Sequence, residues 1–421
     1  MITVINARDY ALERPRRGTA PAAVVSAVTE IITGVIERGD DALREYTAKF
    51  DGCSVDSFEL APSALDAAVR DVGFEFVGIM ERAARNIEDF HRRQIRHGFV
   101  MTPGSGVVLG QRILPIERVG LYIPGGTAAY PSSVLMNCIP ARLAGVSEVV
   151  ICTPPSREGG ADAGILAALA VAGIGRVFTV GGAQAIAAMA YGTATIPRVD
   201  KILGPGNAFV AEAKRQVFGD VGIDMIAGPS DILVIADNGA DAALVAADLL
   251  SQCEHGEDSA AILITDSAML AESVAQQVEA QLKALPREAI ARASIENNGK
   301  IIIADSLSQA FEISNRIAPE HLEIFLSEPM QYLDRVKNAG SVFLGRSTPE
   351  ALGDYYAGPN HTLPTSGTAR FASPLSVDDF IKKSSFSYYT ADALCAAGPD
   401  IVAFAEKEGF SAHAQSVAKR L

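Results

Sequence analysis

The spacing of apolar positions along the chain changes near residue 106. Between residues 21 and 95 apolar residues recur every three or four positions, which predicts amphipathic helices over 22–38 and 63–93. Pro21 suits a first helical turn, because proline lacks the amide hydrogen that such a position leaves unused. No arrangement of residues in this part of the chain suggests chemistry.

After Gly106 short β-branched runs alternate with alanine-rich segments, which predicts parallel strands covered by helices on both faces. The expected strands are 118–123, 148–152, 176–180, 200–203, 231–236, 260–265 and 300–304. The expected helices are 131–144, 161–172, 183–191, 208–217, 242–254 and 267–284. Joints rich in Gly and Pro at 124–126, 204–206 and 228–229 lie beside these elements, where open α/β sheets bind ligands. Residues 371–421 lack this rhythm and are interpreted as a small separate unit with short helices.

Composition narrows the class of protein. The chain of 421 residues carries 36 Lys and Arg against 50 Asp and Glu, a net charge of −14. This balance opposes nucleic-acid binding, which needs an excess of basic residues. The one dense basic run, 91–97, is interpreted as a solvated helix end. The five cysteines are scattered without a CxxC pair, as is typical of a reducing cytoplasm.

Neither a leader nor a membrane span is expected. Residues 1–8 lack the charged and then apolar layout of a signal peptide. The charge-free stretches 119–141 and 177–197 are interrupted by Gly-Gly, Pro and polar residues, so neither supplies the roughly 20 apolar residues of a span. We therefore expect a soluble, cytoplasmic protein.

One predicted helix ends in residues that could bind a metal ion. Gln252 and His255 are three positions apart, so on a helix they share a face. An amide oxygen and a neutral imidazole suit Zn²⁺. From this segment alone, a polar helix end with His255 on the last carbonyls is the favoured alternative. Cys253 would point away from that face.

Three other places carry polar groups suited to chemistry. Glu320 and His321 follow Pro319 at an element boundary, where they could act as two separate proton acceptors, although such a pair is usually just exposed. Residues 353–365 hold more hydrogen-bonding side chains than a connecting loop needs. His413, taken alone, is interpreted as a surface residue. The standard dinucleotide, phosphate-loop, zinc-protease and serine-hydrolase signatures are absent.

Taken together, these segments resemble the histidinol dehydrogenase family, in order and over nearly the whole chain from about residue 20. The matching stretches are VGLYIPGG (119–126), YPSSVLMNCIPA (130–141), GGAQAIA (181–187), GPGNAFVAEAKRQVFG (204–219), GIDMIAGPSDILV (222–234), 252–256, APEHL (318–322), AGSVFLG (339–345), 348–370, 375–383 and 408–413. So many collinear segments are more specific than any single motif. Asp231, where many members have Glu, and Cys253, where Ala is usual, depart from the pattern.

The resemblance implies an α/β fold with two incomplete Rossmann-like domains that have parallel sheets, plus two small terminal domains. The first large domain would combine residues 22–121 and 231–374, and the second, which binds NAD, would be inserted as 122–230. Residues 1–21 and 375–421 would be dimerisation segments of a homodimer whose active site is completed by the partner chain.

The resemblance also implies the reaction. L-Histidinol would be oxidised through L-histidinal to L-histidine, in the last steps of histidine biosynthesis, with two NAD reduced in turn. His321 would take the alcohol proton, and Glu320 would activate water to hydrate the aldehyde. The implied contacts with NAD are Tyr122, Gln184 and Asn207.

A Zn²⁺ ion, one per subunit, is implied as a second cofactor that binds and orients the substrate. Its expected ligands are Gln252, His255, Asp354 and, from the partner subunit, His413. Ser230, His361 and Glu408 are expected to contact the substrate beside these ligands and His321. Glu408 would face the cationic amino group of histidinol.

Three alternatives remain open. A same-fold zinc- and NAD-dependent dehydrogenase could act on another small alcohol, such as a sulfonated diol, although Glu408 disfavours an anionic substrate. A zinc hydrolase could use Glu320 to activate water, and a requirement for NAD would separate it from a dehydrogenase. The third alternative is a non-catalytic paralogue. It is disfavoured because such a protein would not need every catalytic and metal position of the family, and all of them are present.

Overall fold

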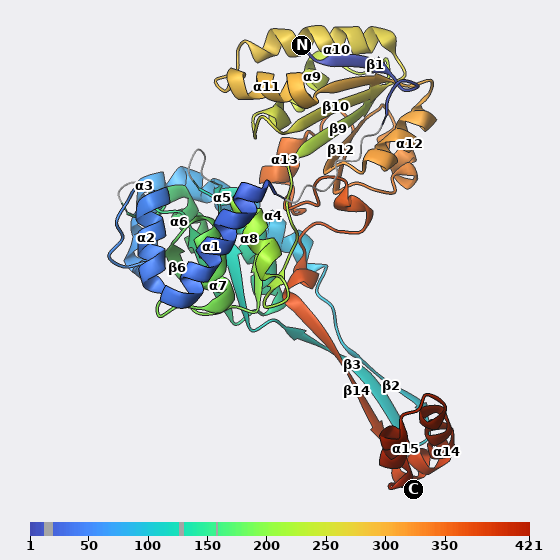
Figure 1. Cartoon of the computed structure of the whole chain (residues 1–421). Helices are drawn as coiled ribbons and strands as arrows, with labels where there is room; N and C mark the ends of the chain where they lie inside the picture. Colours follow the sequence, from blue (N-terminus) through green and yellow to red (C-terminus); the bar gives the residue numbers. More distant parts are fainter. Residues whose placement is uncertain (12–19, 126–129, 157–158) are drawn as a thin grey trace.

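The computed structural model describes residues 1–11, 20–125, 130–156 and 159–421. Two parallel sheets form two layered bodies, and an antiparallel ribbon extends away from them (Figure 1). The six-stranded sheet has the order β1-β11-β10-β9-β12-β13. Its strands are β1 (Thr3–Asn6), β9 (Asp231–Ala236), β10 (Ala260–Thr265), β11 (Lys300–Ile303), β12 (His321–Phe325) and β13 (Ser341–Leu344).

The five-stranded sheet has the order β6-β5-β4-β7-β8. Its strands are β4 (Arg118–Tyr122), β5 (Glu148–Thr153), β6 (Val177–Thr179), β7 (Lys201–Leu203) and β8 (Gly222–Ile223). Apart from β1, which lies at the edge beyond β11, the chain in each sheet adds successive strands outward in one direction, from β4 or from β9, and then continues on the opposite side of that strand. The reversal lies between β4 and β7 in this sheet and between β9 and β12 in the other.

Helices cover both faces of each sheet, because nearly every strand residue inside the sheets is apolar and buried. On the six-stranded sheet, one core contains α9 (Ala242–Cys253), α10 (Ala268–Leu282) and α11 (Glu288–Asn298), and the other contains α12 (Leu307–Ile317). On the five-stranded sheet, one core contains α1 (Ala22–Arg38), α2 (Asp40–Phe50), α7 (Gly182–Tyr191) and α8 (Ala208–Val217). The opposite core contains α3 (Pro62–Val72), α4 (Phe74–Arg92), α5 (Pro131–Ala144) and α6 (Ala163–Ala172).

The predicted α/β class with parallel sheets is confirmed, and the seven predicted strands are present within a residue or two of their expected ends. The expected helix 63–93 is two helices, because Gly73 between them has a φ of 83°, which ends α3. His91 is fully buried rather than part of a solvated helix end, and its Nδ1 lies 2.7 Å from the side chain of Gln94.

The helices of residues 22–92 pack on the five-stranded sheet, which differs from the expected grouping of 22–121 with 231–374. An amphipathic pattern shows that a helix has an apolar face, but it does not show which sheet that face covers. We therefore propose that the described residues of 22–92 and 118–230 form one body, while 231–344 form the other. Residues 1–21 were expected as a dimerisation segment. Here β1 is the edge strand of the six-stranded sheet, and 12–19, like Gly126 of the VGLYIPGG stretch, lie outside the described residues.

The ribbon carries the C-terminal unit far from both sheets (Figure 1). It pairs β2 (Phe99–Gly104) and β14 (Ile381–Tyr389) with β3 (Val107–Pro115), and it leads to α14 (Ala391–Lys407) and α15 (Ser411–Ala418). The sequence pattern missed this ribbon because β14 buries neither face, so alternation of apolar and polar residues is absent. No helix among the described residues is long and apolar enough to cross a membrane.

Candidate active site

A cleft of about 610 Å³ lies where the two sheets face each other. The five-stranded sheet contributes the loops that follow β4 and β7, including Pro124 and residues 204–207. The six-stranded sheet contributes residues that precede or begin β9 and β12, including Ser230 and His321. The cleft therefore joins the carboxyl ends of one sheet to the amino ends of the other.

Reciprocal hydrogen bonds hold the amino ends of β9 and β12 together. The backbone amide of Asp231 donates to Glu320 Oε2 at 3.1 Å, and the amide of Glu320 donates to Asp231 Oδ1 at 2.9 Å. Nδ1 of His321 lies 3.0 Å from the backbone carbonyl of Asp231. A carbonyl oxygen can only accept, so Nδ1 carries the proton and Nε2 is the basic nitrogen of the neutral ring. Both Glu320 and His321 are about 5% exposed or less, so neither is the exposed turn residue of the alternative reading.

Carboxylates surround His321 and control its charge. Nε2 lies 3.7 Å from Glu350 Oε1 and 3.7 Å from Asp354 Oδ1. Burial opposes protonation of the ring, but Glu350, Glu320 and Asp354 outweigh it and hold the pKa of His321 well above its ordinary value. Burial also raises the pKa of Glu320 to about 8, with His321 opposing the shift. Glu320 can therefore exchange protons near neutral pH.

A candidate metal centre lies beside this pair. Ligand atoms of His255, Glu350 and Asp354 all lie within 4.8 Å of one another. Gln252 lies in the last turn of α9, and His255 lies beyond the end of that helix, where its backbone amide donates to the backbone oxygen of Gln252 at 3.2 Å. The fully buried side-chain amide of Gln252 has no hydrogen-bond partner for either polar atom among the described residues. A buried amide without partners is costly unless a ligand satisfies it. Imidazole, carboxylate and amide oxygens together fit Zn²⁺, so the residues present suit the implied ion.

Glu350 is the residue of this centre that the sequence did not reveal. It begins α13 (Glu350–Tyr355), four positions before Asp354, so both carboxylates lie on one helix face. Its backbone amide donates to Glu323 Oε1 at 2.8 Å, and its side chain accepts from Ser251 Oγ at 3.1 Å. The i, i+4 spacing to Asp354 was the available signal, but a six-residue helix is too short to show a periodic pattern.

His361 and Ser230 also line the cleft, as expected for substrate contacts. Nδ1 of His361 lies 3.0 Å from the backbone oxygen of Asp354, and its Nε2 lies 3.2 Å from Ser133 Oγ. Ser133 belongs to α5 on the five-stranded sheet, so His361 connects the two bodies across the cleft. Burial lowers the pKa of His361, with Asp354 opposing the shift.

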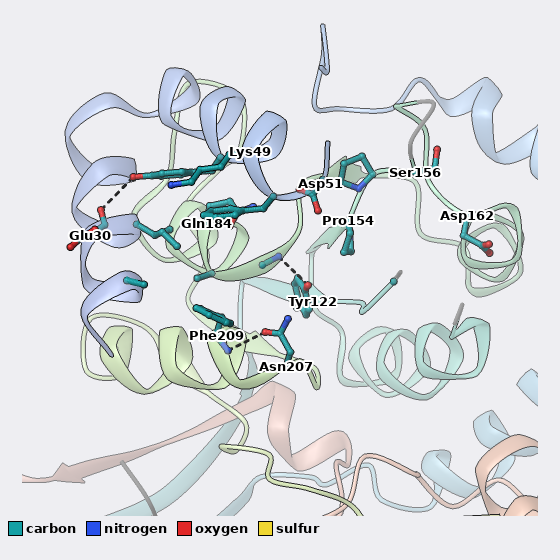
Figure 2. A pocket seen from close by; sticks show the side chains of 18 of the residues that line it. Glu30, Lys49, Asp51, Tyr122, Pro154, Ser156, Asp162, Gln184, Asn207 and Phe209 are labelled. Atoms are coloured by element: carbon teal, nitrogen blue, oxygen red, sulfur yellow. Dashed lines mark hydrogen bonds between the residues drawn. The ribbon is translucent and has the colours of Figure 1, made fainter. Parts of the chain in front are cut away.

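A larger cavity of about 1070 Å³ opens from the five-stranded sheet beside the cleft. The three residues expected to contact NAD, Tyr122, Gln184 and Asn207, all line it (Figure 2). The phenol oxygen of Tyr122 accepts from the amide of Gly182, whose φ of 65° favours glycine at the start of α7. Gly125 and Asn207 line both the cavity and the cleft, so one extended ligand can reach from one into the other.

A buried ion pair holds the loop between the cavity and the cleft. Lys214 and Asp224 form a salt bridge with only 2% of each side chain exposed. Lys214 Nζ donates to the backbone oxygen of Gly204 at 2.9 Å, and the amide of Gly204 donates to Asp224 at 2.8 Å. The side chain of Asn207 then caps α8 by accepting from the amides of Phe209 and Val210. The glycine-rich joint thus has a fixed shape.

His413 and Glu408 do not join the site within one chain. Both are exposed residues of the C-terminal unit, at the far end of the ribbon from the cleft (Figure 1). His413 contacts the ring of Phe410, with ring centroids 5.3 Å apart. Of the expected ligands, the structure brings His255 and Asp354 together, with Glu350 in addition, and Gln252 lies three positions before His255 with a buried, unpartnered amide.

Comparisons with known proteins give matches over nearly the whole chain. The family model for histidinol dehydrogenase matches residues 14–421. A curated histidinol dehydrogenase of Bacillus cereus is 54% identical over 394 residues, covering 94% of this chain and 92% of the relative. That of Geobacillus kaustophilus is 53% identical over 395 residues, covering 94% and 93%. The crystal structure of histidinol dehydrogenase from Elizabethkingia anophelis has a TM-score of 0.93 and 39% identity, covering 100% of this chain and 98% of that one.

Proposed function

The chain belongs to the histidinol dehydrogenase family, and from that premise we propose how its cleft carries out the reaction. The protein is an NAD-dependent dehydrogenase that oxidises L-histidinol to L-histidine through L-histidinal. The observation that carries our assignment of roles is the orientation of His321. Its Nδ1 faces the backbone oxygen of Asp231, so its basic Nε2 faces the candidate metal centre.

In the first oxidation, we propose that Nε2 of His321 takes the hydroxyl proton of histidinol while the carbon-bound hydrogen leaves as hydride to NAD. The products are the aldehyde, one NADH and one proton. Glu350 and Asp354 favour the resulting imidazolium, because both carboxylates lie 3.7 Å from Nε2. The burial of the ring excludes water that would otherwise compete for the proton.

In the second oxidation, Glu320 takes a proton from water as its oxygen adds to the aldehyde, and the imidazolium of His321 returns its proton to the aldehyde oxygen, which gives the hydrate and restores the neutral ring. The hydrate then loses its hydroxyl proton to His321 and its hydride to a second NAD, which gives the carboxylic acid. A pKa near 8, raised by burial, makes Glu320 a stronger base than an exposed carboxylate. Two bases are needed because one cleft oxidises both an alcohol and an aldehyde hydrate.

Gln252, His255 and Asp354 would hold one Zn²⁺ ion, with His413 of the partner subunit as a further ligand. When bound, the ion supplies a positive charge that binds and orients the amino alcohol. Ser230 and His361 line the same cleft and would contact the substrate there. Tyr122, Gln184 and Asn207 would contact NAD in the adjoining cavity.

A homodimer is the natural way to bring His413 and Glu408 to a cleft. The ribbon and the C-terminal unit expose large apolar side chains that a second copy would cover. These are Phe99, Val100, Met101, Phe386, Tyr388, Tyr389, Ile401, Phe404 and Phe410. Glu408 of the partner subunit would then face the cationic amino group of histidinol. We place the dimer in the cytoplasm, since all five cysteines are free.

The proposal is tested by following NADH at 340 nm with histidinol and NAD. We expect two NADH for each histidinol, loss of activity after chelation, and recovery when Zn²⁺ is returned. Full activity in metal-free protein would refute the role of the zinc ligands. An absence of NADH from a protein that still binds zinc would favour another small alcohol, such as a sulfonated diol, as the substrate.

A further inference from the structure

Asp51, at the end of α2, carries a carboxylate oxygen that nothing in the described protein satisfies. The side chain lines the cavity that also contains Tyr122 and Asn207 (Figure 2). Its Oδ2 is buried and has no hydrogen-bond partner among the described residues. Burial of an unpaired carboxylate is costly, and it persists in proteins mainly where a ligand supplies the missing donors. The side chain as a whole lines the cavity and is only partly buried, so rotation of the carboxylate can bring an acceptor oxygen to a ligand there.

The other two acids of the cavity differ from Asp51. The Asp162 carboxylate accepts from the amides of Gly164 and Ile165 at 2.7 and 3.2 Å, so it is occupied as the cap of α6. Glu30 is exposed to solvent. The one cation among the described lining residues is Lys49, whose Nζ lies 5.3 Å from the centre of the Phe50 ring. Asp51 is thus the acid placed to interact directly with a ligand.

The position of Asp51 indicates which half of NAD it would meet. Hydride transfer requires the nicotinamide in the cleft beside His321, so the rest of the cofactor must extend past Gly125 and Asn207 into the cavity. In Figure 2, Tyr122 lies between Asn207 and Asp51, so Asp51 is on the side of the cavity away from the loop that joins it to the cleft. That side receives the adenosine half.

The ribose of this half carries two hydroxyl donors, and a buried carboxylate is a strong acceptor for them. A phosphate at the 2′ position would instead place a second anion against the carboxylate, where burial prevents water from screening the repulsion. We propose that Asp51 accepts hydrogen bonds from the adenosine ribose of NAD and selects NAD against its 2′-phosphorylated form. This inference rests on the assignment of the cavity to NAD under the proposed function.

The test is calorimetric titration of ADP-ribose and of its 2′-phosphorylated form into the dimeric protein, which needs no catalysis. Wild-type protein should bind ADP-ribose at least ten-fold more tightly than it binds the 2′-phosphorylated form. In Asp51→Asn the affinity for ADP-ribose should fall about ten-fold, as expected for the loss of a hydrogen bond to a charged group. The ratio of the affinity for ADP-ribose to the affinity for its 2′-phosphorylated form should also decrease. Glu30→Gln removes an exposed acid from the same cavity and should leave both affinities unchanged.

A second control separates this inference from the cavity assignment. Asn207→Ser removes the amide but retains an oxygen that can cap α8, and it should weaken ADP-ribose binding if the cavity holds NAD. Suppose that Asn207→Ser binds ADP-ribose more weakly, whereas Asp51→Asn keeps both the wild-type affinity and the preference over the 2′-phosphorylated form. This result would overturn the role of Asp51 but not the assignment of the cavity to NAD. Unchanged binding in both variants would overturn both. The melting temperature of Asp51→Asn should not fall, since the asparagine retains the backbone bond to Thr47 and relieves an unpaired charge.

Discussion

The two parallel sheets present opposite ends to the cleft between them. The five-stranded sheet faces it with the carboxyl ends of β4 and β7, at the point where its strand order reverses, which is the usual ligand position in open α/β sheets. The six-stranded sheet also uses its reversal, between β9 and β12, but it faces the cleft with the amino ends of these strands. The usual rule locates the larger cavity and does not locate the pair Glu320–His321.

The chemistry of the two ends differs accordingly. Around the larger cavity, glycine-rich loops, Tyr122 and Asn207 provide shape and neutral hydrogen-bonding groups. At the amino ends of β9 and β12, ionisable groups are buried against one another, and burial raises the pKa of Asp231 to about 6 and that of Glu350 to about 7. One sheet is therefore suited to binding, and the other is suited to moving protons.

The largest effect should come from His321. His321→Asn retains a group that can donate to the backbone oxygen of Asp231 but cannot take a proton, so kcat should fall by up to about 10⁴-fold. Binding of ADP-ribose, which depends on the other sheet, should stay unchanged in calorimetry. A variant that retained more than a tenth of the wild-type kcat would contradict the assignment of His321 as the base.

The next largest effect should come from Lys214, on the five-stranded sheet. Lys214→Met leaves the buried Asp224 carboxylate without its cation, which should lower the free energy of unfolding by about 3–5 kcal/mol in urea denaturation. The neighbouring loop at Gly204 should loosen and ADP-ribose should bind more weakly. Lys283→Met, at an exposed lysine, should change neither quantity. Equal stability of the two variants would show that the ion pair does not hold the loop.

Glu320 should separate the two oxidations. Glu320→Gln cannot activate water, so oxidation of added L-histidinal should slow by about 100-fold. The first hydride transfer from histidinol should be much less affected when it is followed in a single turnover. An equal fall in the rates of both oxidations would mean that Glu320 acts in both. Unchanged rates of both oxidations would show that Glu320 has no role in the mechanism.

Glu350 should give a smaller effect with a characteristic pH dependence. Its carboxylate raises the pKa of His321, so Glu350→Gln should lower that pKa. The neutral, basic form of His321 would then persist to lower pH, and the acid limb of kcat/KM should shift to lower pH while kcat falls about ten-fold. Glu257→Gln, an exposed acid near His255, is the matched control. If Glu350→Gln instead loses bound zinc, Glu350 is a metal ligand rather than a residue that tunes His321.

Sequence patterns predicted the parts of the molecule whose signal is local. The apolar strands such as 231–236 and 260–265 match their observed bounds because they are buried on both faces. The glycine-rich joint after β7 and the pair Glu320–His321 were likewise recognised, and both line the cleft. The roles of the predicted site residues remain predictions.

The parts that depend on distant packing were not predicted. No local pattern shows that α1–α4 cover the five-stranded sheet. Nor does any local pattern show that Asp51, in a stretch interpreted as free of chemistry, lines the larger cavity. Glu350 acquires its importance only when α13 packs beside α9 and β12. The exposed position of His413 agrees with its reading as a surface residue in one chain, and only a second chain could give it another role.

The central claim is that each cleft is built by the two sheets of one chain and completed by His413 of the partner subunit. Two inactive variants, His321→Asn and His413→Asn, are co-expressed with different tags, and the mixed dimer is purified on both. Such a dimer has one cleft with neither substitution and one with both, so it should recover about half of the wild-type activity. A mixed dimer as inactive as either parent would contradict the claim, because it would place both histidines in the same chain's cleft.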